Sequence, residues 1–142
     1  MANTRDILIP KRILLVEDDI LLANMFEKDL STANFSVTTA YQGSQVVELA
    51  EQHLFDLIFL DLLLPGKSGF EILKELKANK KTKDVPVIII TNLGEVEHME
   101  RALALGAADY VIKANVSPKE IRGLANKYLL HHTARSHEYQ KE

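Results

Sequence analysis

Five short runs of apolar residues, separated by stretches with helical periodicity, constrain this sequence more than any other feature. The runs lie at residues 13–16, 35–40, 57–60, 85–90 and 110–112. Several are uninterrupted, and residues 87–90 read VIII, whereas a strand with one wet face would alternate apolar and polar residues. Continuous apolar strands are typical of a parallel sheet that is covered by helices on both faces.

The segments between these runs carry apolar residues three and four positions apart, which is the spacing of one helix face. Two such faces consist of Leu22, Met25, Phe26 and Leu30, and of Ile121, Leu124, Ala125 and Tyr128. Ser117 with Glu120, and Ser68 with Glu71, have the capping-box spacing of helix starts, and Gly106 is a helix stop. The sequence therefore predicts five β-α units with right-handed crossovers, in an α/β fold.

Length and composition limit the classes of protein that this chain can represent. It has 142 residues, about the size of one domain, and no cysteine, which excludes disulfides, thiolate metal sites and cysteine nucleophiles. Its net charge of −3 argues against binding to nucleic acid by itself or to an anionic membrane, and no apolar run is long enough to span a bilayer. We expect a cytoplasmic protein with a flexible lead at 1–10, one domain at 11–130 and a polar tail or helix extension at 131–142.

Polar residues follow the predicted strands at the points where those strands end. Glu17 and Asp18 follow the first run, Asp61 the third, Thr91 the fourth and Lys113 the fifth. In open parallel sheets, ligands bind beyond the carboxyl ends of the strands, where the strand order reverses. Three carboxylates at close range repel one another unless a cation is present, and hard oxygen ligands without histidine or cysteine favour Mg²⁺.

Four segments in this order resemble the receiver domain of response regulators. They are LLVEDD at 14–19, DLIFLDLLLPGKSG at 56–69, VPVIIITN at 85–92 and GAADYVIKAN at 106–115. The resemblance covers about residues 11–130 and implies a flavodoxin-like, doubly wound (βα)5 fold with a five-stranded parallel sheet in the order 2-1-3-4-5. It also implies a function in two-component signalling.

The resemblance implies a role for each residue that matches a family motif. Asp61 is expected to accept a phosphoryl group, while Thr91 and Lys113 contact the phosphoryl oxygens. Tyr110 matches the aromatic position that changes rotamer on phosphorylation, although an aromatic residue there could equally be plain core. Receiver domains take their phosphoryl group from a histidine kinase or a phosphotransfer protein, and they are switches whose only chemistry is their own phosphotransfer and self-dephosphorylation.

The resemblance also implies a Mg²⁺ site next to the acceptor. Asp18 and Asp61 are expected to be direct ligands, with Glu17 acting through water and the backbone carbonyl of Leu63 completing the protein's share. Mg²⁺ together with lysine would neutralise the transferring oxygens. Asp19, in contrast, is expected to be an ordinary helix N-cap.

Three residues depart from the pattern of the family. Glu17 stands where aspartate is more usual, Asn92 follows Thr91 where a small residue is common, and Ala114 follows Lys113 where proline is usual. A Lys-Pro bond in the family is generally cis, but a non-proline cis bond costs about 2.5–4 kcal/mol. We therefore predict a trans peptide between Lys113 and Ala114.

Three other functions are compatible with parts of this pattern. A flavin-binding flavodoxin-like protein would need a phosphate-cradling loop after the first strand, where this chain has three repelling carboxylates. An aspartyl-phosphate hydrolase would need an acid two residues from its nucleophile after that strand. The third alternative is a phosphorylation-independent interaction module with a receiver-like fold. The leading interpretation remains a phospho-switch that contacts an unknown downstream protein or forms a homodimer through segment 95–105, the fifth strand and the last helix.

Overall fold

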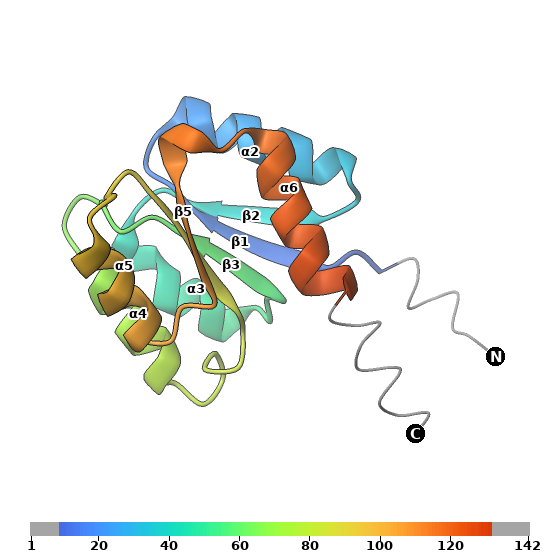
Figure 1. The fold of residues 1–142 in the computed structure, drawn as a ribbon. Helices are drawn as coiled ribbons and strands as arrows, with labels where there is room; N and C mark the ends of the chain where they lie inside the picture. Colours follow the sequence, from blue (N-terminus) through green and yellow to red (C-terminus); the bar gives the residue numbers. More distant parts are fainter. Residues whose placement is uncertain (1–8, 132–142) are drawn as a thin grey trace, which may run out of the picture.

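The computed structural model describes residues 9–131 as a central parallel sheet with helices on both faces (Figure 1). Its strands are β1 (Arg12–Val16), β2 (Ser36–Ala40), β3 (Leu57–Leu60), β4 (Val87–Thr91) and β5 (Asp109–Ile112). Its α-helices are α2 (Ile20–Thr32), α3 (Val46–Gln52), α4 (Gly69–Ala78), α5 (Val96–Ala104) and α6 (Pro118–Asn126). Two 3₁₀ turns, η1 (Gly43–Gln45) and η2 (Lys113–Asn115), and one π-helical turn, η3 (Lys127–His131), complete the described elements.

The five strands lie in the order β2-β1-β3-β4-β5, and every pairing is parallel. This order confirms the predicted flavodoxin-like topology. The order of the strands reverses at β1, so that β1 and β3 flank the crevice in which such folds bind their ligands. None of the helices in the described part of the chain has the length and apolar content that a bilayer crossing requires.

The sheet separates two apolar cores, because its central strands are buried on both faces. One core lies under α2 and α6 and includes Phe26, Phe59 and Ile121. The other lies under α3, α4 and α5 and includes Ile58 and Leu73. Figure 1 shows these two helical layers on opposite sides of the strands. The residues of β3 and the first three residues of β4 have no exposed surface, which explains their uninterrupted apolar sequence.

One predicted core residue on α2 is on the surface instead. Met25 is 55% exposed, whereas Ala23, Phe26 and Leu30 are buried. These three residues are spaced three and four positions apart, so they define the core-facing stripe, and Met25 lies outside it. Leu22 packs at the edge of the core, as predicted.

Local signals set most helix ends as the sequence predicts. Asp19, Ser68 and Ser117 each cap the helix that follows by accepting a backbone N–H. Gly106 follows Leu105, the C-cap of α5, and adopts a positive φ of 107°, which supports its predicted role as a stop. The predicted lead at 1–10 and tail at 131–142 lie almost entirely outside the described residues.

Candidate functional site: an acidic cluster closed by a lysine

Strand register brings the chemically important side chains to one edge of the sheet. Val16 of β1 pairs with Leu60 of β3, so the residues that follow them, Glu17 and Asp61, emerge side by side. Thr91 is the last residue of β4 and pairs with Ile112, the last residue of β5. Lys113 therefore follows immediately beyond the end of the β4–β5 ladder. Parallel pairing thus converts distant positions in the sequence into neighbours.

The lysine amine lies between two buried carboxylates. Lys113 Nζ is 2.8 Å from Glu17 Oε1 and 2.5 Å from Asp61 Oδ2. Glu17 is 2% exposed and Asp61 is 3% exposed. Backbone amides hold the other carboxylate oxygens: the Asp19 N–H donates to Glu17 Oε2, and the Leu63 N–H donates to Asp61 Oδ1, both at 3.0 Å. Both carboxylates are therefore held in fixed positions by charge-assisted hydrogen bonds.

Burial and pairing oppose each other in setting the protonation of this cluster. Burial raises the pKa of Glu17 above its ordinary value of 4.5, although hydrogen bonds from Lys113 and the Asp19 amide act in the opposite direction. Burial also tends to lower the pKa of Lys113, but its hydrogen bonds to Asp61 and Glu17 outweigh this effect and raise the pKa. The net result is that the pKa of the Lys113 amine and the pKa of the Glu17 carboxyl both lie above their ordinary values.

Asp18 completes a group of three carboxylates. Glu17, Asp18 and Asp61 each place one oxygen within 4.8 Å of the others, and the Asp18 side chain is exposed to solvent. Lys113 compensates only one of these three negative charges. A cluster of oxygen ligands with excess negative charge and an open side fits a hydrated divalent cation, and Mg²⁺ in particular.

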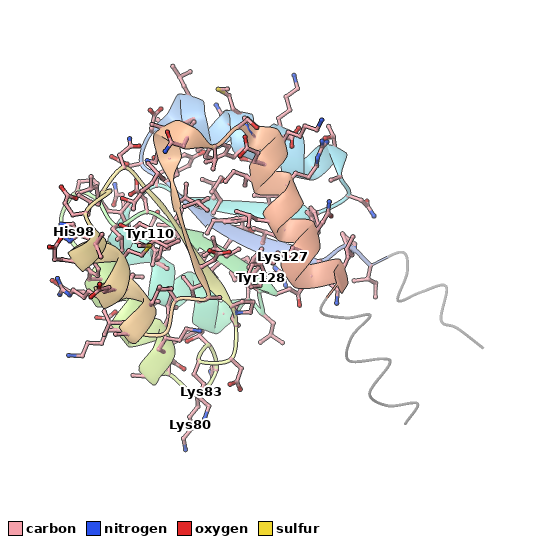
Figure 2. The ribbon with its side chains drawn as sticks, in the orientation of Figure 1. Lys80, Lys83, His98, Tyr110, Lys127 and Tyr128 are labelled. Carbon is pink, nitrogen blue, oxygen red and sulfur yellow. The ribbon has the colours of Figure 1, made fainter. Side chains whose placement is uncertain are left out.

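Thr91 and Tyr110 meet at the backbone of Leu93, in the loop between β4 and α5. Thr91 is fully buried, and its hydroxyl oxygen accepts the Leu93 N–H at 3.4 Å. The Tyr110 hydroxyl donates to the Leu93 carbonyl at 2.5 Å. Tyr110 also packs against the core under α5, and Figure 2 shows its labelled side chain on that side of β5. Tyr110 is thus partly a core residue and partly a contact to the loop after Thr91.

The loop after the acceptor depends on a close approach between two backbone segments. A Cβ built on Gly69 would lie 2.4 Å from the Asp61 carbonyl oxygen and 2.5 Å from Leu62 Cα. Only glycine allows α4 to begin against the end of β3 in this way. The Gly69 N–H also donates to the Leu62 carbonyl at 3.1 Å, which closes the loop behind Asp61.

Asn92 and Ala114, two of the residues that depart from the family pattern, are in contact. The Lys113–Ala114 peptide is trans, as predicted, because the described residues contain no cis bond. The Ala114 N–H donates to Asn92 Oδ1 at 2.9 Å. The sequence marks Asn92 and Ala114 as separate departures from the family pattern and does not indicate their pairing. The available signal is their positions just beyond the last strand pair, one residue after Thr91 and two residues after Ile112.

The comparisons with known proteins identify the family. The family model described as "Response regulator receiver domain" matches residues 13–126, so this chain belongs to the response-regulator receiver family. A curated relative, "Phosphate regulon transcriptional regulatory protein PhoB" of Rhizobium meliloti, is 36% identical over 112 residues, which cover 79% of this chain and 49% of the relative. The chain spans less than half the length of the first curated relatives that it matches.

Solved structures of the same fold support this family assignment. A response regulator from Chloroflexus aurantiacus superposes with a TM-score of 0.79 at 29% identity, covering 86% of this chain and 99% of the other. A structure described as the phosphorylated cyanobacterial phytochrome response regulator RcpA has a TM-score of 0.79 at 28% identity, covering 85% of this chain and 95% of the other. The chain is therefore a receiver domain of the two-component response-regulator type, and such domains are in general switches.

Proposed function

We propose that this chain is a phosphoryl-accepting switch in which Asp61 takes a phosphoryl group from the phosphohistidine of a histidine kinase or phosphotransfer protein. The observation that carries this proposal is the contact of Lys113 Nζ with both Asp61 and Glu17 at the carboxyl edge of the sheet. Thr91, at the end of the neighbouring strand, supplies a hydroxyl group. A buried nucleophile with a fixed cation and a hydroxyl beside it is suited to phosphoryl transfer.

The acidic cluster supports a resident Mg²⁺. Asp18 and Asp61 would hold the ion directly, the Leu63 carbonyl would supply a backbone ligand, and Glu17 would act through water. The bonds that Glu17 makes to Lys113 and the Asp19 amide support this indirect role. When bound, Mg²⁺ would neutralise negative charge on the transferring oxygens.

The transfer step follows from what the protein's own groups do. One Asp61 oxygen forms a bond to phosphorus while the phosphorus–nitrogen bond of the phosphohistidine breaks, and the imidazole nitrogen keeps the electron pair of that bond. The Leu63 amide and Lys113 orient the Asp61 carboxylate before the attack. Lys113 and the Thr91 hydroxyl then stabilise the phosphoryl oxygens, because both are hydrogen-bond donors.

The signal would leave the site through the loop after Thr91. Leu93 contacts the Thr91 hydroxyl through its N–H and the Tyr110 hydroxyl through its carbonyl. A movement of Thr91 toward a phosphoryl group would break the first contact and shift the second. Phosphorylation would thereby change the population of conformers of the surface formed by α5, β5 and α6. Homodimerisation or docking of a downstream protein would read this change.

The organisation and setting of the domain are part of the same proposal. The switch would comprise residues 11–130, act in the cytoplasm and bind no nucleic acid by itself, consistent with the net charge of −3. The chain would turn over no substrate other than its own aspartyl phosphate. Several relatives carry names that describe transcriptional regulators, which supports a protein partner in a regulatory pathway.

Intact-mass spectrometry tests the proposal. The wild-type chain should gain one hydroxylamine-labile phosphoryl group from acetyl phosphate with Mg²⁺ and none with EDTA. Asp61→Asn should gain none, whereas Asp84→Asn, a change at an exposed aspartate, should behave like wild type. A wild-type chain that gains no phosphate from either acetyl phosphate or phosphohistidine would instead support the phosphorylation-independent interaction module.

A further inference from the structure

The side chain of Asn92 bridges the two strand ends that carry Thr91 and Lys113. Its Oδ1 accepts the backbone N–H of Ala114 at 2.9 Å, although the two residues are 22 positions apart in the sequence. Both residues are exposed, so neither belongs to an apolar core. The bond therefore fixes backbone geometry rather than filling space.

The position of this bond is determined by the end of the β4–β5 ladder. Thr91 and Ile112 form the last pair in register. Beyond that pair the strands diverge, because Asn92 enters the loop toward α5 and Lys113 begins the 3₁₀ turn η2. The Asn92 side chain thus extends the connection between the strands by one step after the backbone ladder has stopped.

The bonded amide lies directly after the catalytic lysine. Fixing the Ala114 N–H restricts the backbone of Lys113 on its C-terminal side, while β5 restricts it on the N-terminal side. The Lys113 amine must reach two buried carboxylates at 2.8 Å and 2.5 Å. A lysine side chain has many rotamers, so fixing the backbone to which it is attached limits the range of positions that its amine can occupy.

A second hydrogen bond, from Tyr110 of β5, holds the same loop. The Tyr110 hydroxyl donates to the carbonyl of Leu93, the residue after Asn92. The loop after Thr91 is therefore held at two points, by Tyr110 of β5 before Lys113 and by Ala114 of η2 after it. The two ties differ in kind, since the tyrosine is partly packed in the core and the asparagine is on the surface.

We propose that Asn92 is a positioning residue for phosphoryl transfer: through the Ala114 N–H it clamps the Lys113 turn to the end of β4, so that the lysine amine and the Thr91 hydroxyl keep a fixed spacing. This inference rests on the proposed function, because it concerns the rate of the transfer to Asp61. The clamp is distinct from the catalytic groups, since Asn92 contacts the backbone and not the acceptor.

A double-mutant cycle tests the clamp. Asn92→Ala removes the acceptor of the bond, Ala114→Pro removes its donor, and Ala114→Ser is a control that keeps the donor. The readouts are the initial rate of phosphorylation by acetyl phosphate at saturating Mg²⁺, as a function of donor concentration, and hydrogen exchange of the Ala114 amide. The thermal midpoint of each variant monitors folding.

The bond between neutral groups predicts a moderate effect. Asn92→Ala should lower the maximal phosphorylation rate by about two- to tenfold, with little change in the donor concentration at half-maximal rate. Its Ala114 amide should exchange faster, and Ala114→Ser should match wild type in both readouts. In the Ala114→Pro background, Asn92→Ala should cause no further loss, because the bond is already absent.

Two outcomes would overturn the clamp while leaving the proposed function intact. One is an unchanged rate in Asn92→Ala when its Ala114 amide has lost protection. The other is multiplication of the two single effects in the double variant, which would show that they act independently. A wild-type chain that gains no phosphate would overturn the proposed function itself, and the positioning role with it.

Discussion

Replacing Lys113 by methionine would remove the cation between two buried carboxylates while keeping a side chain of similar length. Glu17 and Asp61 side chains are each 3% exposed, and the variant would leave both without this partner. Removing one member of a buried ion pair typically costs about 3–5 kcal/mol. We expect the lower end, about 3 kcal/mol in the absence of metal, because both carboxylates keep a backbone amide donor.

Although Lys113→Met should be less stable without metal, its stability should respond more strongly to Mg²⁺ than that of the wild type. Three carboxylates and one lysine leave two net negative charges in the wild-type cluster, and the variant leaves three. Mg²⁺ should therefore stabilise Lys113→Met more than wild type, since the repulsion that it relieves is larger. The cost of the substitution should also shrink at mildly acidic pH, where Glu17, whose pKa burial already raises, takes up a proton.

Urea unfolding in EDTA and in Mg²⁺ measures both effects. The control is Lys80→Met, which changes an exposed lysine that Figure 2 shows far from β5, and it should shift the free energy of unfolding by less than about 0.5 kcal/mol. A cost below about 1 kcal/mol for Lys113→Met in EDTA, or an equal response of both proteins to Mg²⁺, would refute the role of the lysine in holding the cluster together.

Three further predictions concern the same edge of the sheet. Asp18→Ala should abolish Mg²⁺ binding in titration calorimetry, and unchanged affinity would exclude Asp18 as a ligand. A carboxyl group whose pKa is raised on folding contributes stability that is complete below its unfolded pKa and is lost as the pH rises through its folded pKa. In thermal melts without metal, the wild type should therefore lose stability above pH 4.5, and Glu17→Gln should lose less. The side chains of Leu63, which is 53% exposed beside the acceptor, and of Leu93 cannot form a hydrogen bond to an attacking water. The double variant Leu63→Asn with Leu93→Glu should therefore shorten the half-life of the phosphoprotein by about 10²-fold. Decay no faster than that of the wild type would show that these leucines do not slow the hydrolysis.

Strand-level features of this protein could be predicted from its sequence because they depend on local patterns. The run at 57–60 is uninterrupted and apolar, and the structure shows it as the fully buried β3. The residue after such a strand emerges at the carboxyl edge of the sheet, so the position of Asp61 followed from the pattern alone. The strand order needed the family resemblance, since periodicity does not distinguish one parallel order from another.

Side-chain pairings could not be predicted in the same way. The family resemblance implies that Glu17 acts on a metal through water, but nothing in the sequence indicates that its carboxylate also contacts Lys113, 96 positions away. That contact depends on how far the lysine, which follows β5, reaches past the ends of β4 and β3 toward the end of β1. Asn92 and Ala114 were each recognised as unusual, but their hydrogen bond depends on where the β4–β5 ladder ends. The prediction that Met25 faces the core is wrong because Met25 and its neighbour Phe26 both satisfy an approximate apolar spacing, and only Phe26 is buried.

The most direct test of the central proposal is to identify the phosphorylated residue chemically. Borohydride reduces an aspartyl phosphate to homoserine, and tandem mass spectrometry of the digested chain locates that residue. After incubation with acetyl phosphate and Mg²⁺, homoserine should appear at position 61, and it should be absent when EDTA replaces Mg²⁺. Homoserine at position 18 or 19, or the absence of any homoserine from a chain that has gained phosphate, would contradict the assignment of Asp61 as the acceptor.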